Sequence, residues 1–363
     1  MIYIAYFILG FTILQFLVAL ANLIFFPGLP KGTLNSEPLV SVLIPARNEE
    51  NNIGTILNDL KNQHYQNIEI IVFNDLSTDK TEEIINSSAK LDNRIKLVNS
   101  EGLPKDWLGK VFGCYSLAKI AKGDYFLFLD ADVRVSGNII SNSVSFMNKK
   151  KLGLISIFPK QILKSFGEKI TVPNMNYILL TLLPLIFVRK SKFRSFSAAN
   201  GQFMFFEAKL YKEMQPHKKM KDNKVEDIAI ARYYKQHKIK ISCLVGNKTM
   251  ECRMYNGFKE ATNGFSKNVA AFFGNSYVVS VIFWLLTTFG FLFILFNLPI
   301  TLFIIFIFVF FATRIIVSIV SKQNILENMI YLIPQQLSLG IFIYKGFINK
   351  FIKDYQWKGR SIN

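Results

Sequence analysis

The stretch YFLFLDAD at residues 125–132 joins a continuous apolar run to two aspartates separated by one residue. A short apolar run of this length, bounded by polar residues, is typical of a buried β-strand. The aspartates then mark the point where the strand reaches the surface. Similar runs at Val40–Ile44, Ile68–Phe73 and Ile95–Val98 predict three more strands before it.

Helical patterns lie between these strands, near Asn51–Lys61, Lys80–Lys90 and Val111–Ala121. Strand–helix alternation predicts an α/β fold with a mostly parallel sheet and helices on both of its faces. Ligands of such sheets bind beyond the carboxyl ends of the strands. The residues that follow each strand are therefore the candidates for a functional site.

Polar clusters follow three of the four predicted strands, at residues 45–50 (PARNEE), 74–79 (NDLSTD) and 130–132 (DAD). Each cluster has a structural alternative, because several of its short polar side chains could cap the helix that follows. The residues open to this alternative are Asn48, Ser77, Thr78 and Asp79. Three clusters at one edge of a sheet nevertheless favour a binding site.

Asp130 and Asp132 point to a divalent cation. Side chains spaced by two in a strand start on the same face, and two carboxylates there repel one another unless a cation lies beside them. Mg²⁺ and Mn²⁺ use one or two protein carboxylates and complete their shell with water and substrate phosphates. The pair therefore predicts a site for Mg²⁺ or Mn²⁺.

Apolar segments flank the predicted α/β domain. The run Ile2–Phe26 is long enough to span a membrane, and it lacks the basic start and clear cleavage site of a signal peptide, the alternative interpretation. Tyr277–Phe296 and Leu298–Val320 are two further candidate spans, and we expect Arg314 to snorkel toward lipid headgroups. The predicted organisation is an anchor at 1–27, a domain at 38–275, a membrane region at 277–349 and a tail at 350–363.

Charge predicts the orientation of these parts. Basic loops stay in the cytoplasm, and the net charge of +18 lies mostly in the middle domain. We therefore expect a multi-pass protein of the plasma membrane with a cytoplasmic domain and a basic cytoplasmic tail. The stretch Met329–Ile348 is interrupted by Pro334, and it could span or lie in the interface; the basic tail after it favours the second arrangement.

The segment 170–190 begins with an apolar stretch, 170–188, that contains two prolines, and the basic residues Arg189, Lys190 and Lys192 come directly after that stretch. It predicts an interfacial helix that seats an opening at the membrane surface, with a buried core helix as the alternative.

Composition argues against several function classes. A basic domain can attract nucleic acid, but flanking spans favour an anionic membrane surface or phosphate-bearing substrates. The cysteines Cys114, Cys243 and Cys252 have no metal-site spacing, which excludes a zinc or disulfide framework and fits reducing cytosol. A transporter would carry several charges along its spans, and Arg314 is the one charge inside the two strong C-terminal runs.

The domain from Leu39 to Asn275 resembles the GT-A fold of glycosyltransferase family 2, whose members are inverting, metal-dependent enzymes that use nucleotide-sugars. The matching stretches are residues 45–50, 74–81, 107–110 (WLGK), 128–133, 200–204 (NGQFM) and 225–227 (VED). Residues 253–255, 264–268 and 357–360 are similar to the subgroup that acts on membrane lipids, which includes carotenoid glycosyltransferases of the staphyloxanthin type and hopene-associated glycosyltransferases.

The resemblance implies a donor site. Asp75 would accept a hydrogen bond from uracil, Glu49 would contact the nucleoside and Lys110 would reach the diphosphate, although a solvated lysine at a helix start is the structural alternative for Lys110. Asp132 would ligate the metal, with Asp130 contacting ribose or metal-bound water. The implied donor-binding residues are Pro45, Arg47, Glu49, Asp75, Lys110, Asp130 and Ala131.

Glu226 and Asp227 open a helical stretch, and two acids at a helix N-terminus are favourable without any catalytic role. The resemblance instead makes Asp227, with Glu226 beside it, the general base that deprotonates an acceptor hydroxyl. We expect nearby cations to keep this carboxylate ionised, namely Lys221, Lys224 and Arg232. The implied acceptor-side residues are Gly201, Gln202, Phe203, Arg253, Trp357 and Arg360.

The expected function is transfer of a single sugar from a nucleotide-sugar, which we expect to be UDP-linked, to the hydroxyl or carboxylate of a membrane lipid. The Gln-x-x-Arg-Trp pattern associated with processive members is absent, which favours single-sugar transfer. A polyprenyl-phosphate sugar transferase and a non-catalytic membrane protein that binds nucleotide-sugars are the alternatives. Partners are then the donor, the lipid acceptor and the bilayer, and not nucleic acid.

Overall fold

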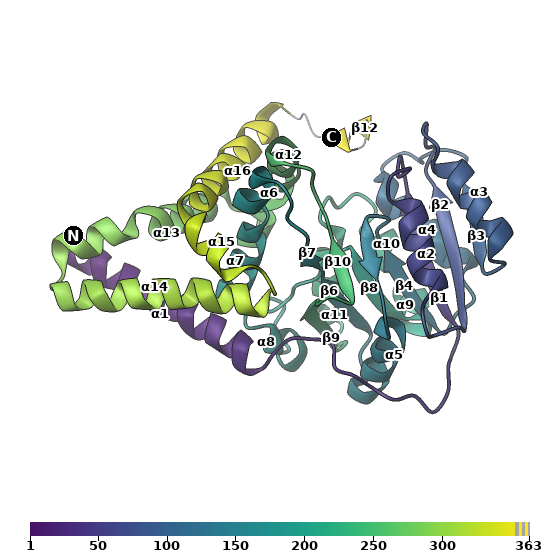
Figure 1. Ribbon diagram of the computed structural model, residues 1–363, viewed down its shortest axis with the longest axis horizontal. Coiled ribbons are helices and arrows are strands. Elements are labelled where there is room, and N and C mark those ends of the chain that lie inside the picture. Colours follow the sequence, from purple (N-terminus) through teal and green to yellow (C-terminus); the bar gives the residue numbers. More distant parts are fainter. Residues whose placement is uncertain (353–355, 358–359, 362–363) are drawn as a thin grey trace. The chain divides into compact units, whose positions relative to one another are not determined.

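The computed structural model describes residues 1–352, 356–357 and 360–361, and the chain divides into two compact units (Figure 1). The sheet unit comprises Pro27–Lys160 and Leu185–Cys252. The helical unit comprises Met1–Phe26, Gln161–Pro184 and the chain from Arg253 onward. The compact units thus divide the chain differently from the domain 38–275 predicted above, because 161–184 and 253–275 pack in the helical unit.

A seven-stranded sheet with the order β3-β2-β1-β4-β8-β6-β9 forms the core of the sheet unit. Strands β1, β2, β3 and β4 are parallel to one another, β6 and β9 are parallel, and β8 runs antiparallel to both β4 and β6. The strands are β1 Val40–Ala46, β2 Ile68–Asn74, β3 Ile95–Asn99, β4 Tyr125–Leu129, β6 Leu154–Phe158, β8 Phe203–Glu207 and β9 Ile241–Val245. The predicted α/β fold with a mostly parallel sheet is confirmed.

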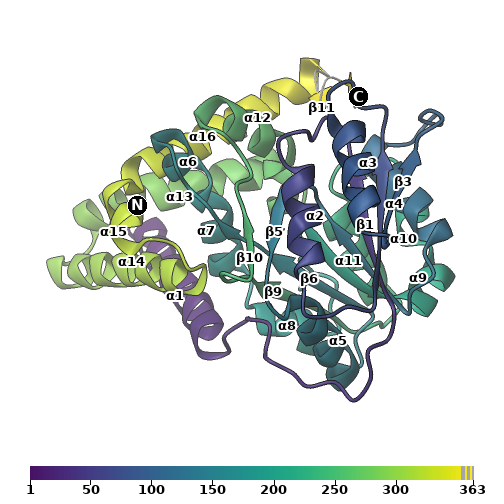
Figure 2. The ribbon, with the colours of Figure 1, turned by 45° about the vertical axis from the view of Figure 1, so that its right-hand side comes forward.

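Helices pack against the strands of this sheet, which explains why the strand sequences are apolar. Every residue of β2 and β4 is buried, as expected for parallel strands with helices on both faces. Helix α4 packs against β1 and β2, α3 against β3 and α8 against β9 (Figure 2). The helices of this unit are α2 Ile53–Lys61, α3 Thr81–Leu91, α4 Gly109–Ile120, α5 Ile139–Lys150, α8 Leu185–Lys190, α9 Ala208–Met214, α10 Pro216–Lys219 and α11 Glu226–Gln236.

A second, three-stranded sheet has the order β5-β10-β7, with β5 Val133–Val135, β10 Met250–Cys252 and β7 Lys160–Gln161. Its first strand follows β4 after a short turn, and β5 and β10 are antiparallel. The turn between β4 and β5 therefore holds the two aspartates of the opening stretch, which lie outside both strands.

Among the described residues, three helices of the helical unit are long and apolar enough to cross a membrane: α1 Ile2–Ile24, α13 Tyr277–Asn297 and α14 Ile300–Val320. Helix α1 packs against both α13 and α14, around an apolar cluster that includes Ile8, Ile294 and Phe306. The later apolar stretch forms α15 Ile325–Ile330 and α16 Leu332–Ile352. Within the described residues, α16 is not among the helices that meet the same length and hydropathy requirement.

The segment predicted as one interfacial helix divides into three helices. Helices α6 Phe166–Thr171 and α7 Pro173–Leu182 belong to the helical unit, and α8 belongs to the sheet unit. Every residue of α7 except Leu182 is buried, and α7 packs against α1, α14 and α16. For α7 the structure therefore shows the buried helix that was the alternative interpretation.

Arg314 does not snorkel as we expected. Its side chain is 4% exposed, and its guanidinium carbon lies 3.5 Å from the centroid of the Tyr177 ring. The expectation was wrong because α7, which carries Tyr177, covers this face of α14. A sequence pattern for α14 alone gives no information about that neighbour.

Candidate functional site

Two loops at the carboxyl ends of β1 and β2 are joined by hydrogen bonds. The backbone N–H of Asn48 donates to Ser77 Oγ (3.0 Å), and the N–H of Thr78 donates to Asn48 Oδ1 (2.9 Å). The N–H of Glu49 donates to Thr81 Oγ1 at 2.7 Å. The polar side chains that could have capped helices thus connect one loop to the other. Asp79 also accepts a bond from the N–H of Thr81, at the start of α3.

Asp75 lies at the base of these loops and is 3% exposed. Its N–H donates to the carbonyl of Ala46 at 2.8 Å, and Arg47 Nη1 donates to the carbonyl of Asp75 at 2.6 Å. Arg47 therefore fixes the backbone that carries Asp75. Pro45, also predicted here, belongs to β1, where an added Cβ on Gly113 of α4 would lie 3.2 Å from it.

The turn between β4 and β5 carries Asp130, Ala131 and Asp132. The N–H of Val133 donates to the carbonyl of Asp130 at 3.4 Å, so the two aspartates lie in a turn and the same-face argument for a strand does not apply to them. The Asp130 carboxylate binds Lys110 Nζ, with distances of 2.7 Å to Oδ1 and 2.8 Å to Oδ2. Ala131, which separates Asp130 from Asp132 in the sequence, is buried.

Asp132 lies close to Cys252 of β10. Burial raises the pKa of the Cys252 thiol above its usual value, and the charge of Asp132 adds to that rise. Gln202 Nε2 donates to Cys252 Sγ at 2.9 Å. Gln202, predicted on the acceptor side, thus lies on the same side of the turn as Asp132. Cys252 had no sequence signal, because its position depends on the pairing of β10 with β5.

Four side chains form a charge cluster: Lys110, Asp130, Glu226 and Asp227. Lys110 Nζ lies 3.7 Å from Glu226 Oε1 as well as beside Asp130. Lys110 lies in the first turn of α4, and the two acids are the first two residues of α11. The solvated-lysine alternative for Lys110 does not hold in the structure, because its ammonium group bridges acids from two other elements.

Gly201 brings the backbone to this cluster. Its N–H donates to Asp227 Oδ2 at 2.9 Å, while the N–H of Ile228 donates to Oδ1 at 2.7 Å. An added Cβ at Gly201 would lie 3.0 Å from Lys110 Nζ and 3.4 Å from Glu226 Oε1. A side chain at this position would therefore crowd the cluster. Both oxygens of Asp227 are held in place by backbone donors.

Burial and mutual repulsion shift the titration of the acids. Burial raises the pKa of Glu226 to about 7, against the lowering effect of Lys110, and Asp227 contributes to the rise. Burial also raises the pKa of Asp227, while the N–H of Ile228 and then Lys110 lower it. Burial alone would lower the pKa of Lys110, but Asp130 and Glu226 raise it above its usual range.

Lys110 is the main cation that acts on these carboxyls. We expected Lys221, Lys224 and Arg232 to keep Asp227 ionised, and none of them is among the main causes of the shift in its pKa. The expectation relied on proximity in sequence, whereas Lys110 reaches the cluster from another helix.

Asp130 and Asp132 are the carboxylates of this turn that could hold a hard divalent cation, and the Asp130 carboxylate is paired with Lys110. Among the described residues, no group of three or more His, Cys, Asp or Glu side chains is placed to hold a metal ion. A cation bound by these two carboxylates would need water and substrate phosphates as its other ligands, as is usual for Mg²⁺. A tetrahedral site made only of protein side chains is not present in this part of the chain.

The predicted acceptor-side residues fall into both units. Gly201 and Gln202 adjoin the charge cluster and Cys252, and Phe203 is a fully buried residue of β8. Arg253 belongs to the helical unit, where its Nη2 lies 2.8 Å from Glu168 Oε1. Trp357 and Arg360 belong to the short strands β11 Gln356–Trp357 and β12 Arg360–Ser361, and their side chains lie outside what the structure describes.

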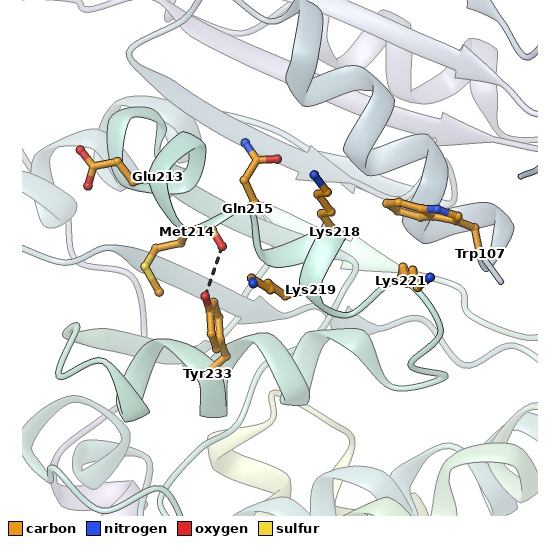
Figure 3. A pocket seen from close by; sticks show the side chains of 8 residues that line it. All are labelled: Trp107, Glu213, Met214, Gln215, Lys218, Lys219, Lys221 and Tyr233. Carbon is orange, nitrogen blue, oxygen red and sulfur yellow. Dashed lines mark hydrogen bonds between the residues drawn. The ribbon is translucent and has the colours of Figure 1, made fainter. Parts of the chain in front are cut away.

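A basic hollow of about 530 Å³ adjoins α10 (Figure 3). Trp107, from the loop before α4, lines it together with Tyr233, whose hydroxyl donates to the carbonyl of Met214 at 3.4 Å. The other lining residues are Glu213, Met214, Gln215, Lys218, Lys219 and Lys221. We expected Lys221 to act on Asp227 and did not predict this hollow, although the basic run at 217–221 is visible in the sequence.

The family model of glycosyl transferase family 2 matches residues 41–214. The 4,4'-diaponeurosporenoate glycosyltransferase of Staphylococcus haemolyticus (strain JCSC1435) is 27% identical over 234 residues, which are 64% of this chain and 61% of that protein. The protein of the same name from Staphylococcus aureus (strain USA300) is 26% identical over 263 residues, 70% and 68% of the two chains. This chain therefore spans about three fifths to two thirds of these relatives.

A solved structure is similar over almost its entire length. The mannosyltransferase PcManGT from Pyrobaculum calidifontis, in complex with GDP-Man and Mn²⁺, matches with a TM-score of 0.57 at 14% sequence identity. The match covers 96% of this chain and 99% of that one. At this level of identity the similarity is one of fold.

Proposed function

We propose that the chain is a member of glycosyltransferase family 2, whose model matches residues 41–214, and that it transfers one sugar from a nucleotide-sugar to a lipid acceptor in a membrane. The observation that carries the proposal is the charge cluster with its backbone donors, which lies in the sheet unit where β4 ends and where α4 and α11 begin. A sheet of this kind binds its ligand at that edge. The three helices with the length and composition of membrane spans favour a lipid over a soluble acceptor.

The loops after β1 and β2 bind the nucleoside in this proposal. Asp75 accepts a hydrogen bond from the base, which we take to be uracil, and Glu49 contacts the nucleoside. The hydrogen bonds of Asn48 and Arg47 hold the two loops in one arrangement before the donor arrives. Such preorganisation lowers the entropic cost of ordering the loops when the donor binds.

Lys110 binds the diphosphate and leaves Asp130 when the donor enters. Its ammonium group is already held between two acids, so an incoming diphosphate replaces one negative partner with another. Asp130 is then available for ribose or for a metal ligand. A divalent cation held by Asp132 and Asp130 would neutralise the charge that grows on the departing diphosphate.

Asp227 is the general base. The acceptor hydroxyl oxygen bonds to the anomeric carbon, the bond from that carbon to the diphosphate breaks, and the hydroxyl proton moves to the Asp227 carboxylate. Attack opposite the leaving group inverts the anomeric configuration. The backbone N–H groups of Gly201 and Ile228 keep the carboxylate oriented. Glu226 affects the protonation of Asp227 because the two neighbouring carboxylates repel each other.

The acceptor in this proposal is a carotenoid-type or related lipid, by similarity to relatives named for diaponeurosporenoate. A carboxylate acceptor is already ionised and needs no base, whereas a hydroxyl acceptor does. The base at Asp227 therefore favours a hydroxyl acceptor. We place the sheet unit on the cytoplasmic side of the plasma membrane, where basic segments are retained.

The test is transfer of radiolabelled sugar by the purified full chain. UDP-sugars are supplied with a total lipid extract, with Mn²⁺, with Mg²⁺ or with EDTA. Wild type is compared with Asp132→Ala, Asp227→Asn and the control Glu213→Gln, which removes an acid that lines the basic hollow and lies outside the charge cluster. We expect metal-dependent labelling of a lipid by wild type and the control, and its loss in the two variants.

The labelled product then identifies the acceptor. An ester linkage released by mild base indicates a carboxylate, an alkali-stable glycoside indicates a hydroxyl, and an acid-labile phosphodiester indicates a polyprenyl-phosphate. If no nucleotide-sugar is turned over, or if Asp132→Ala labels lipid as wild type does, the proposed function is wrong.

A further inference from the structure

Arg314 is a buried cation within α14, one of the helices with the length and composition of a membrane span. It stands six residues before Val320, the last residue of that helix, so it lies roughly 9 Å from the helix end at 1.5 Å per residue. An ionisable side chain in such a segment is costly and commonly marks a functional position. The groups that stabilise its charge therefore indicate what it does.

Aromatic rings lie over the faces of the guanidinium group. Its central carbon is 3.5 Å from the Tyr177 ring centroid and 5.6 Å from that of Phe310, and aromatic faces attract cations. Tyr177 is held in turn by α1, because Gln15 Nε2 lies 3.4 Å from its hydroxyl and 3.2 Å from Thr181 Oγ1. The plane of the guanidinium is thus fixed by two neighbouring helices.

Beyond its contact with Tyr177, the guanidinium has one edge that makes no hydrogen bond to any described residue. Arg314 Nε and Nη2 are both buried, and no hydrogen-bond acceptor among the described residues serves either of them. The N–H groups of these two nitrogens point the same way along one edge of the plane. That edge is the donor pair that binds both oxygens of a carboxylate or phosphate group.

No acid of the described helical unit neutralises this charge. Glu168 is paired with Arg253 at 2.8 Å, Glu327 is paired with Lys169 at 2.6 Å, and Glu260 accepts the N–H of Asn256. A buried charge that lacks a counter-charge is strongly unfavourable. An oxyanion from outside the protein would therefore stabilise the Arg314 charge.

The hydroxyl groups beside Arg314 on α14 do not compete with it as donors. Thr313 and Ser318 are buried beside it, and their hydroxyl groups donate to carbonyls one turn back in the same helix, those of Val309 and Arg314. Their protons are therefore already used. The guanidinium edge remains the strong donor on this face.

We infer that Arg314 binds the oxyanion group of a membrane amphiphile, with Nε and Nη2 donating to its two oxygens and Tyr177 fixing the guanidinium plane. The ligand enters the helical unit from the bilayer. Its anionic group is a lipid carboxylate or a headgroup phosphate, which share this chemistry. The inference concerns the helical unit alone and does not depend on sugar transfer, so either proposal can fail without the other.

The experiment is native mass spectrometry of the purified full chain in detergent, with defined amphiphiles added. The probes are palmitic acid with methyl palmitate as its neutral match, and phosphatidylglycerol with diacylglycerol as its neutral match. We expect wild type to retain at least one anionic probe tenfold or more better than its neutral match. The acid arm and the phosphatidylglycerol arm decide between a carboxylate and a phosphate.

Variants assign the binding to the side chain. Arg314→Gln should lose the preference for the anionic probe, and Arg314→Lys should retain part of it, because an ammonium group keeps the charge without the fork. Lys322→Gln is the matched control, since it removes one charge from an exposed residue just beyond the end of the same helix. It should bind as wild type does.

Two outcomes would overturn the inference. The first is equal retention of each anionic probe and its neutral match by wild type, a comparison that needs no variant to fold. The second is an unchanged preference in Arg314→Gln. A purely structural role would lower the thermal midpoint of Arg314→Gln equally with and without the anionic probe, whereas a binding role abolishes the rise in midpoint that the probe gives to wild type.

Discussion

Asp227 is distinguished from an ordinary acid at a helix start by two backbone donors on its carboxylate, from Gly201 and Ile228. If it is the base, Asp227→Asn should lower kcat about 10²–10⁴-fold, the usual contribution of general base catalysis. Donor affinity should stay within about threefold, because Asp227 is assigned to the acceptor hydroxyl and not to the nucleotide; Asn keeps the shape of the side chain and one of its two acceptor oxygens. Initial rates and calorimetric titration with UDP measure the two effects. A loss of less than tenfold in kcat would assign the base to another group.

Glu226 gives the reaction a pH dependence near neutrality. Burial raises its pKa to about 7, and Lys110 opposes that rise. Because a raised carboxyl pKa means protonation at higher pH, activity that needs the ionised pair should fall as the pH drops through about 7. Lys110→Met removes the opposing charge, so the acidic limb of the kcat profile at saturating donor should move to higher pH.

The control for this shift is Lys218→Met, which removes a lysine of the basic hollow that is not among the main causes of the shift in the Glu226 pKa. Its profile should coincide with that of wild type. A Lys110→Met profile that keeps its acidic limb in place would show that the acids in the charge cluster do not control the rate.

The loops after β1 and β2 act as one element because their side chains bond across to each other. Asn48 has φ of +51° and accepts the N–H of Thr78. Left-handed backbone costs most residues about 1–2 kcal/mol but is tolerated by Gly and Asn. We therefore expect UDP affinity to decrease in the order wild type, Asn48→Gly, Asn48→Ala. The Asn48→Ala variant should bind UDP at least tenfold more weakly than wild type. Equal affinities of the Gly and Ala variants in calorimetry would contradict this.

The sequence predicted these elements well and their mutual contacts poorly. The strands at Val40, Ile68 and Tyr125 begin where the apolar runs begin, because burial on both faces leaves a continuous apolar signature. Asn48 was open as a helix cap, and its actual partner is 30 residues further along the chain. Lys110 was identified through resemblance, but its pairing with Asp130 and Glu226 depends on how α4 and α11 pack.

The buried groups were the hardest to predict. A sequence window around Arg314 contains the apolar residues of α14 and gives no sign of Tyr177, which lies 137 positions earlier. Snorkelling was the simplest expectation for an isolated helix, and tertiary packing removed it. The division of 170–190 among α6, α7 and α8 has the same origin, because both prolines fit either an exposed or a buried helix.

The arrangement of the chain across the membrane follows from which helices cross it. If α1, α13 and α14 span and α16 does not, the sheet unit and the tail share the cytoplasmic side, and the turn at Asn297 lies outside. The described cysteines Cys114, Cys243 and Cys252 are all free and buried, so introduced cysteines can be labelled selectively in intact cells with a membrane-impermeant maleimide. We expect Asn297→Cys to be labelled, and Lys151→Cys and Asn363→Cys to be labelled only after the cells are permeabilised. Labelling of Asn363→Cys from outside would mean that α16 crosses, and labelling of Lys151→Cys from outside would invert the whole arrangement and place the charge cluster away from cytoplasmic nucleotide-sugars.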